Sequence, residues 1–137
     1  MGKKKKQNGA VFLVVVFAIA LIATITMGIL VMTTEELQLM QNQLYSAQAM
    51  CVAETGLNDA FSQIRSVSSW TPDASYTNKA FLTYGSYTVA VTGTPPTRTI
   101  TSTAVSSQGY ISRVSADVTI GTSYPYIIRI DRLRINE

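Results

Sequence analysis

The sequence predicts an α+β protein in which one long N-terminal helix packs on a small antiparallel sheet. Three observations predict this fold class. Residues 10–32 carry no charged side chain, residues 37–64 place apolar side chains at spacings of three and four, and residues 87–120 alternate with a period of two. The chain has 137 residues, which is room for one modest domain with an appended helix. We therefore expect a single folded unit.

The apolar segment of residues 10–32 is long enough to cross a lipid bilayer. As a helix, its 23 residues would span about 35 Å, and the hydrocarbon core is roughly 30 Å thick. Four lysines at residues 3–6 precede it, so the positive-inside rule places the N-terminus in the cytoplasm and Glu35 across the membrane. A cleaved secretory signal has a shorter apolar core and a small-x-small site after it. The exit GILVMTTEE has no such site, so we expect the segment to be retained.

A helical pattern continues beyond this segment to about residue 65, with no proline before Pro72. We expect one helix of about 55 residues, on the order of 80 Å long, whose second half is amphipathic. Gly56 in its interior costs about 1 kcal/mol relative to alanine, so either the sheet packs closely there, which we favour, or the helix loosens. Cys51 is expected to be a small buried side chain, the alternatives being an intermolecular disulfide or lipidation. The predicted stripe consists of Leu37, Met40, Leu44, Ala47, Cys51, Glu54, Leu57, Phe61 and Ile64, and helix–sheet packing is assigned to Cys51, Glu54, Gly56, Leu57 and Phe61.

The C-terminal half reads as a connection followed by strands. The connection is rich in Ser and Thr, and its Trp70 is expected to pack over the helix end or else to be an exposed binding aromatic. Consecutive strands joined by short turns favour an antiparallel meander with one face on the amphipathic helix. The expected strands are residues 87–92, 97–106, 110–120 and 124–130, with Leu133 and Ile135 out of phase after the last.

Composition argues against an enzyme and against a nucleic-acid-binding protein. The chain has one cysteine and no histidine, which removes Ser-His and Cys-His nucleophiles, histidine metal ligands and cysteine zinc clusters. Four of the eleven cations are residues 3–6, so the rest of the chain carries seven cations against eight anions. That balance gives no electrostatic footprint for nucleic acid. We expect no catalytic residue, no cofactor and no metal.

Two motifs resemble parts of a known family. KKKKQNG sets Gly9 directly before the apolar segment, and this order resembles the leader of type IV prepilins. Residues 53–57 read Ala-Glu-Thr-Gly-Leu, which is similar to the N-terminal region of PilX-type minor pilins. The resemblance covers residues 1–65. It implies that a prepilin peptidase cleaves between Gly9 and Ala10 and that Ala10 becomes N-methylated.

The resemblance also implies an organisation and a role. The pilin fold would comprise a leader at residues 1–9, a transmembrane or filament-core helix at 10–32, an amphipathic continuation at 33–66 and a sheet region at 67–137. The protein would be a structural subunit, held in the inner membrane as a single-pass protein and then assembled into an extracellular filament. Implied partners are other pilins, the prepilin peptidase, an assembly platform with its ATPase, and membrane lipid. Filament packing is expected at Val14 and at small residues that permit close approach, namely Ala18, Ala20, Ala23 and Gly28.

Val14 indicates whether the protein would be a major or a minor subunit of the filament. Most major pilins carry a glutamate at the fifth residue after the cleavage, which is Val14 here. The resemblance therefore favours a minor subunit that acts in filament assembly or initiation. It leaves open whether the filament is a type IV pilus, a type II secretion pseudopilus or a competence filament. The alternative is a signal-anchored binding module, a receptor or adhesin that does not polymerise, and Gly9 discriminates because a tether has no use for a cleavage before its apolar segment.

Overall fold

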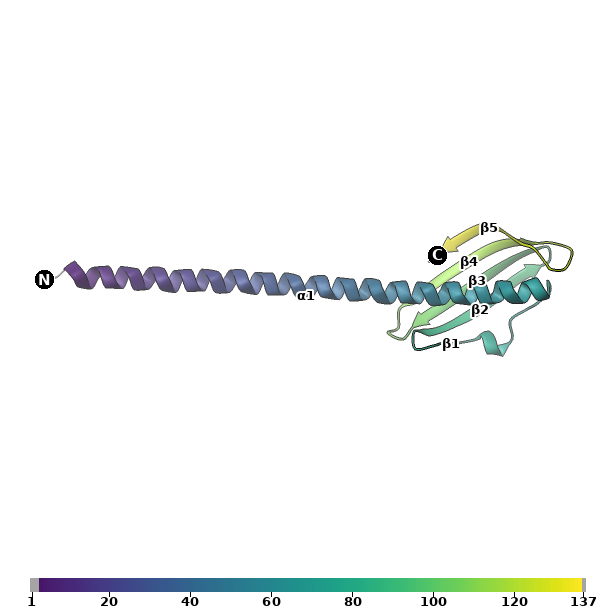
Figure 1. Ribbon diagram of the computed structural model, residues 1–137, viewed down its shortest axis with the longest axis horizontal. Helices are drawn as coiled ribbons and strands as arrows, with labels where there is room; N and C mark the ends of the chain where they lie inside the picture. The colour runs from purple at the N-terminus through teal and green to yellow at the C-terminus, as the bar shows by residue number, and fades with distance from the viewer. Residues whose placement is uncertain (1–2, 137) are drawn as a thin grey trace. The chain divides into compact units, whose positions relative to one another are not determined.

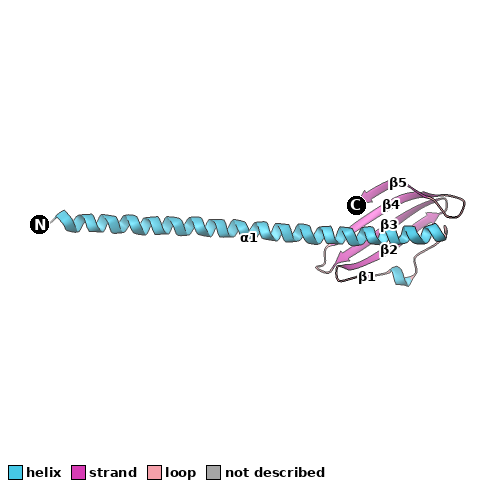
Figure 2. Cartoon of the chain, in the orientation of Figure 1, coloured by secondary structure: helices cyan, strands magenta, loops and turns pink. Residues whose placement is uncertain are grey.

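The computed structural model describes residues 3–136, with side chains from residue 9 onward. The chain divides into two compact units, Met1–Gln41 and Asn42–Glu137. Figure 1 labels the elements along the chain, and Figure 2 distinguishes helix from strand. In order, the elements are α1 (Lys3–Ser66), the 3-10 turn η1 (Ala74–Tyr76), β1 (Lys79–Phe81), β2 (Gly85–Thr94), β3 (Thr97–Ser106), β4 (Ile111–Ile120) and β5 (Ile128–Ile135).

The first unit consists of α1 alone, and the second is the folded domain. In the second unit the last turns of α1 lie on one face of a five-stranded sheet (Figure 1). Every pair of neighbouring strands is antiparallel, and the order is β1-β2-β3-β4-β5. The predicted α+β class and the antiparallel meander are therefore confirmed. The predicted strand at residues 97–106 coincides with β3, and Pro95 and Pro96 form the turn before it.

The hydrophobic core lies between α1 and the three central strands. Side chains on β3 and β4 alternate between buried and partly exposed, because successive residues of a strand point to opposite faces. The even-numbered residues of both strands face α1, together with Tyr87 and Val89 of β2. The buried hydrophobic cluster comprises Val52, Ala53, Leu57, Ala60, Ile64, Tyr76, Tyr87, Val89, Ile100, Ala104, Val114, Ala116, Val118 and Ile120.

The buried side of α1 is rotated from the predicted stripe. Two residues that we expected to pack on the sheet, Cys51 and Glu54, are exposed, and that expectation was wrong. The predicted stripe follows the spacing of large apolar residues such as Leu44 and Leu57, and that spacing passes through Cys51 and Glu54. A helix that approaches a sheet closely instead places small residues at the contact. The side chains that α1 buries against the sheet are Ala49, Val52, Ala53, Gly56, Leu57, Ala60 and Ile64.

The two edge strands also differ from prediction. β1 has only three residues, too few to show an alternation of apolar and polar side chains. These residues were therefore assigned to the connection. β5 begins at Ile128 rather than at residue 124, because Pro125 lacks the N–H that a ladder requires. A β-bulge follows: Ile130 pairs with Val118 and Arg132 with Asp117, which leaves Asp131 as an extra residue. This extra residue explains why Leu133 and Ile135 are out of phase in the sequence.

The connection after α1 is held against the domain by Arg98. This side chain is 3% exposed, and its Nη1 donates to the backbone oxygens of Ser68 at 3.0 Å and Trp70 at 2.6 Å. Burial lowers the pKa of the Arg98 guanidinium. Trp70 is half-buried and meets Tyr76 edge to face, with ring centroids 4.9 Å apart. Trp70 is therefore packed against Tyr76 and the core rather than being a fully exposed aromatic, while its expected place over the helix end stays a prediction.

Candidate functional site

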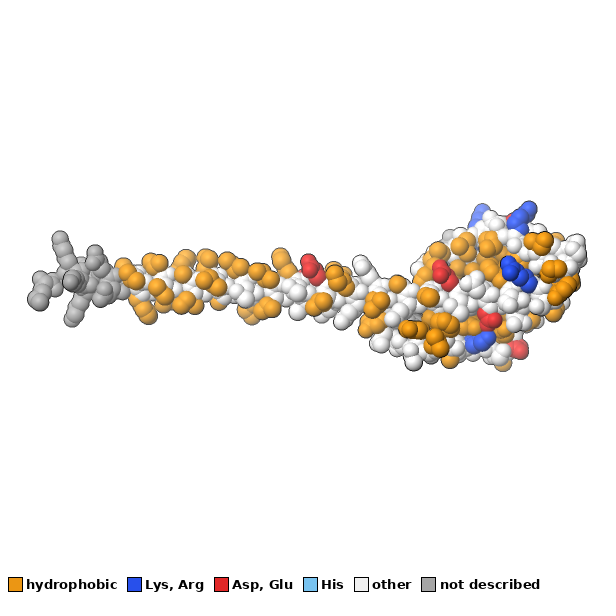
Figure 3. Space-filling view, in the orientation of Figure 1, with side chains coloured by type: hydrophobic (Ala, Val, Ile, Leu, Met, Phe, Trp, Pro, Cys, Tyr) orange, Lys and Arg blue, Asp and Glu red, His pale blue; other side chains and the backbone are white. Residues whose placement is uncertain are grey.

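The first candidate surface is the stretch of α1 from Gly9 to Gln41, in which every side chain is exposed. Figure 3 shows hydrophobic side chains following one another along this stretch on the face in view. Soluble monomers rarely expose a continuous apolar patch of more than a few hundred Å². The large hydrophobic residues within it that are exposed by 48–72% are Val11, Phe12, Leu13, Val14, Val15, Val16, Phe17, Ile19, Leu21, Ile22, Ile25, Met27, Ile29, Leu30, Val31, Met32, Leu37, Leu39 and Met40.

This stretch meets the requirements of lipid. The helix Gly9–Ser66 contains a window long and apolar enough to cross a membrane, a property that membrane anchors and signal sequences share. Threonine hydroxyls inside it have partners within the helix: Thr24 donates to the oxygen of Leu21, and Thr26 to that of Ile22, both at 2.8 Å. Such bonds satisfy hydroxyl groups that hydrocarbon cannot solvate. Orientation across a membrane remains a prediction from residues 3–6, whose side chains lie outside those described.

The expected filament-packing residues do not all share one face of α1. At about 100° per residue, Val14, Ala18 and Gly28 fall within about 80° of one another, whereas Ala20 lies about 120° from Val14. A Cβ added at Gly28 would meet no atom within 4 Å, so nothing in the single chain fills that side of the helix. Val14, Ala18 and Gly28 could therefore form one contact row, and Ala20 would belong to another.

The predicted processing site is part of the same helix. α1 runs through both Gly9 and Ala10, and both residues are exposed. A Cβ at Gly9 would also meet nothing within 4 Å, so the requirement for glycine there does not come from packing within the chain. Cleavage and N-methylation stay predictions that rest on the order of basic, glycine and apolar residues.

The closest contact between α1 and the sheet is made at Gly56. A Cβ at this position would lie 2.4 Å from Oγ of Ser102 and 2.6 Å from a ring carbon of Tyr87. Ser102 is fully buried, and its hydroxyl has no hydrogen-bond partner among the described residues. Leu57 beside it is buried, and Phe61 is half-buried against the core. Close approach of the sheet, rather than a loosened helix, is thus what Gly56 permits.

Cys51 lies on the flank of α1 instead. It borders a hollow of about 290 Å³ that Gln48, Val52, Phe81 and Tyr84 complete. The thiol is exposed and free. The expectation that Cys51 is a small buried side chain was wrong, because the residue lies on the surface.

A polar cluster links β1 to α1, and no pattern in the sequence predicts it. Lys79 Nζ lies 2.6 Å from Oδ2 of Asp59, and the Tyr87 hydroxyl donates to the same oxygen at 2.7 Å. Burial alone would raise the pKa of Asp59, but hydrogen bonds from Lys79 and Tyr87 hold that pKa below its ordinary value. The same hydrogen bond to Asp59 raises the pKa of Lys79, and burial raises that of Tyr87. The ammonium also lies 4.5 Å from the ring centroid of Tyr76.

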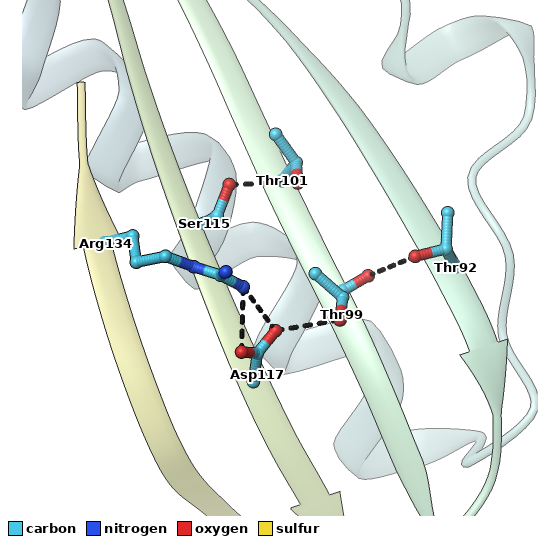
Figure 4. A network of polar contacts seen from close by, with 6 residues as sticks. All are labelled: Thr92, Thr99, Thr101, Ser115, Asp117 and Arg134. Atoms are coloured by element: carbon cyan, nitrogen blue, oxygen red, sulfur yellow. Dashed lines mark hydrogen bonds and ion pairs between the residues drawn. The ribbon is translucent and has the colours of Figure 1, made fainter. Parts of the chain in front are cut away.

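The face of the sheet opposite α1 is polar and internally bonded (Figure 4). Asp117 accepts from Nη2 of Arg134 on both carboxylate oxygens, each at 2.7 Å, and from the hydroxyl of Thr99 at 2.8 Å. Thr101 and Ser115 share a further hydrogen bond of 3.1 Å. These side chains hydrogen-bond to one another, an arrangement that is typical of a solvent-facing sheet surface. Among the described residues, no three His, Cys, Asp or Glu side chains are grouped to hold a metal.

No known protein family, no curated protein and no solved structure matches this chain.

Sequence reasoning found some of these features and missed others. The apolar stretch and Gly56 were identified from composition and helix propensity. Arg98 could have been found, because it stands in phase with Ile100 on an alternating strand. The pairing of Asp59 with Lys79 joins residues twenty positions apart through β1, a strand too short to be recognised.

Proposed function

We propose that this chain is a structural subunit of a type IV pilus or a related pseudopilus, and that it acts in filament assembly or initiation. The observation that carries the proposal is the stretch of α1 whose apolar side chains are exposed on all sides and which continues into a helix packed on a sheet. A tether needs only enough apolar residues to cross the membrane. A subunit that leaves lipid for a filament core also needs a helix that can pack against the corresponding helices of neighbouring subunits.

Two features of the chain support the same proposal. The leader-like order of lysines, Gly9 and the apolar segment fits removal of residues 1–9 with retention of everything after them. No polar group among the described side chains of residues 9–32 needs water, since the threonines bond within the helix. The signal-anchored binding module shares the second feature and not the first.

Intact-mass analysis of the protein from its native membrane tests the proposal. The mature chain should begin at Ala10 and carry one additional methyl group, while Gly9→Leu should remain full-length. Ala10→Ser, a conservative change on the other side of the bond, should still be cut and serves as the control. An N-terminus at residue 1 or 2, or one created beyond residue 32, would contradict the proposal and favour a tether or a signal sequence.

The rank of the subunit has its own test. In major pilins, a glutamate at this position would pair with a neighbour's N-terminus, because a carboxylate in apolar surroundings is costly unless it is paired. Val14 has no carboxylate and cannot make that pair. Glu35 and Glu36 lie about 30 Å further along the helix and cannot replace it. We expect low abundance in sheared filaments and impaired initiation on deletion. Quantitative mass spectrometry that finds this chain to be the dominant subunit would contradict the minor rank and leave the filament role standing.

Gly28 is expected to be the weak point of the membrane segment once the filament forms. α1 is helical through this residue in the single chain, but glycine is the poorest helix former after proline. Nearby Thr24 and Thr26 already bond to backbone oxygens of the preceding turn, and such bonds often bend a helix. A filament structure with unbroken helix over residues 24–30 would refute this expectation.

A further inference from the structure

Two turns meet at one end of the sheet. Residues 82–84 join β1 to β2, residues 107–110 join β3 to β4, and both turns lie at the same end of the second unit (Figure 1). The backbone N–H of Ser107 donates to the backbone oxygen of Tyr84 at 2.9 Å, which holds the two turns together. These turns therefore form one continuous edge of the domain.

The same end is where α1 enters the second unit. Tyr45 is the first described side chain of α1 that is partly buried, and its ring centroid lies 5.8 Å from that of Tyr110. The Tyr110 hydroxyl also donates to the side chain of Asn42, the first residue of this unit. We call this the entry end of the domain.

The entry end exposes apolar side chains from four neighbouring strands and their turns. Leu82 is exposed by 76%, Ile111 by 70% and Tyr84 by 47%. Val105, which pairs with Ile111, is exposed by 37%. The sequence has no charged residue at positions 80–97 or 99–112. We call Leu82, Tyr84, Val105 and Ile111 the entry rim.

Leu82 is also held in a backbone conformation that suits a different residue. Its φ is 49°, in the left-handed region that glycine and asparagine adopt readily and bulky side chains rarely adopt. A leucine there is unfavourable twice in water, through backbone strain and through its exposed aliphatic side chain. Such an outlier indicates that the side chain has a partner outside the domain.

The path of the chain indicates that this partner is lipid. Asn42 follows Met32, the last residue of the apolar segment, by ten residues. As a helix, ten residues span about 15 Å, and the headgroup region fills about 5–7 Å beyond the hydrocarbon core. A tilt of up to about 40°, within the range of transmembrane helices, shortens the remaining distance and lowers one side of the domain toward the membrane.

The chemistry of the entry rim fits the membrane surface. Tyrosine is enriched at membrane–water interfaces, and aliphatic side chains of surface-bound segments enter the boundary between headgroups and acyl chains. The first charged residue after the second turn is Arg113, which is exposed and would be attracted by anionic headgroups. The rim therefore combines an apolar tip, tyrosine and a cation, with no acidic residue in either turn.

We propose that the entry rim inserts into the headgroup region of the membrane that α1 spans, with Leu82 at its tip. This inference rests on the membrane anchoring in the proposed function, and it does not depend on polymerisation. The contact is made while the subunit is held in the membrane, so it positions the folded domain before any filament forms.

Fluorescence quenching by spin-labelled lipid tests this contact. The full chain with Cys51→Ser is placed in vesicles of phosphatidylethanolamine and phosphatidylglycerol, and one introduced cysteine carries an environment-sensitive fluorophore. Thr83→Cys places it next to Leu82, whereas Ile127→Cys places it at the opposite end of the sheet, on a residue that is 77% exposed. With the nitroxide at headgroup depth, we expect at least threefold stronger quenching at position 83 than at position 127.

A pair of substitutions separates docking from folding. Leu82→Asn suits the left-handed conformation, so thermal unfolding should show a domain at least as stable as before, while quenching at position 83 should fall at least twofold. Ile127→Asn is the matched change at the opposite end and should leave quenching at position 83 unchanged. Full quenching with Leu82→Asn, or an equal loss with both variants, overturns the proposal.

A third fluorophore position distinguishes this inference from the proposed function. Ile25→Cys lies in the apolar stretch, and quenching by a nitroxide deep in the acyl region reports whether α1 enters the bilayer. Deep quenching at position 25, with positions 83 and 127 quenched equally or not at all, overturns the docking and retains the anchor. Headgroup quenching confined to position 83, without deep quenching at position 25, retains the docking and contradicts the anchor.

Discussion

Residues 9–41 and residues 42–66 belong to one helix and meet their surroundings in opposite ways. In the first stretch every side chain is exposed, and large aliphatic residues occur on all sides. In the second stretch, seven residues are buried on one side, and four of them are alanine or glycine. Ala49, Ala53, Gly56 and Ala60 recur at spacings of three and four, so they form a single row. Large residues on all sides suit lipid or a bundle of like helices, whereas a row of small residues lets a helix approach a sheet.

The largest difference between the stretches should appear when an isoleucine is truncated in each. Ile64 is 0% exposed and Ile29 is 59% exposed. Ile64→Ala should lower the free energy of unfolding of the domain by about 2–5 kcal/mol, because it leaves a cavity between α1 and the sheet. Thermal unfolding of the full chain in detergent, followed by Trp70 fluorescence, measures this. The matched change Ile29→Ala should leave the transition where it is, and a comparable shift from both would mean that the first stretch also folds onto the domain.

The two glycines of the helix give a second comparison. A side chain at Gly56 meets Ser102 and Tyr87 at less than 3 Å, while one at Gly28 meets nothing. Gly56→Val should therefore destabilise the domain by about 2 kcal/mol through overpacking. Gly28→Val should leave unfolding unchanged in detergent and reduce incorporation into filaments if that face packs against other subunits. Equal tolerance of valine at both glycines in the unfolding assay would contradict the close helix–sheet contact.

Acid should weaken the domain through Asp59. Since the folded-state pKa of Asp59 is depressed, its contribution is present above about pH 4 and is lost as the pH falls through the lowered value. Lys79 and Asp59 are partly exposed, so we expect Asp59→Asn to cost only about 1 kcal/mol at pH 7.

The test follows the difference in unfolding free energy between Asp59→Asn and the wild type from pH 7 to pH 2. That difference should shrink toward zero at the acid end. Glu54→Gln, an exposed position on the same helix, should show no such difference at any pH. A constant penalty for Asp59→Asn down to pH 2 would show that the carboxylate charge is not what binds Lys79.

The smallest effect is expected on the outer face of the sheet. Thr99→Val removes one hydroxyl that donates to Asp117 and keeps the β-branched shape that strands favour. Asp117 retains Arg134 on both oxygens, so the loss should be about 0.5 kcal/mol. Chemical denaturation of the full chain resolves a change of this size when compared with Thr103→Val. A loss above about 2 kcal/mol would mean that the polar face contributes to stability as the core does.

Much of the fold could be predicted because two periodicities are visible along the chain. The change from spacings of three and four to a period of two separates α1 from β2, β3 and β4. The run of residues without a charged side chain identifies the apolar stretch. The buried side of α1 could not be predicted in the same way. Large apolar residues such as Leu44, Leu57 and Phe61 dominate the periodicity, and steps of three and four between them pass through Cys51 and Glu54 instead of Ala53 and Ala60. Close packing on a sheet selects the small residues.

Edges were harder to predict than the centre for a physical reason. β1 and β5 each pair on one side only, so their sequences need not alternate over a full strand length. The contacts that define their place, such as Lys79 with Asp59, join residues far apart in the chain. The candidate functional residues of the apolar stretch follow from the sequence. The exposed apolar side chains of β5, Ile130, Leu133 and Ile135, could be placed only from the sheet order.

The bulge in β5 has a consequence for how the length of this chain can vary. Because Asp131 is one residue more than the ladder needs, deleting it would restore regular pairing and leave Leu133 and Ile135 on the same face as before. A one-residue deletion among residues 133–135 would instead turn the following side chains over. The tolerated deletion has its own cost: a regular, uninterrupted edge is a template for non-specific strand addition. A shortened chain should therefore fold with the same core and yet aggregate more readily.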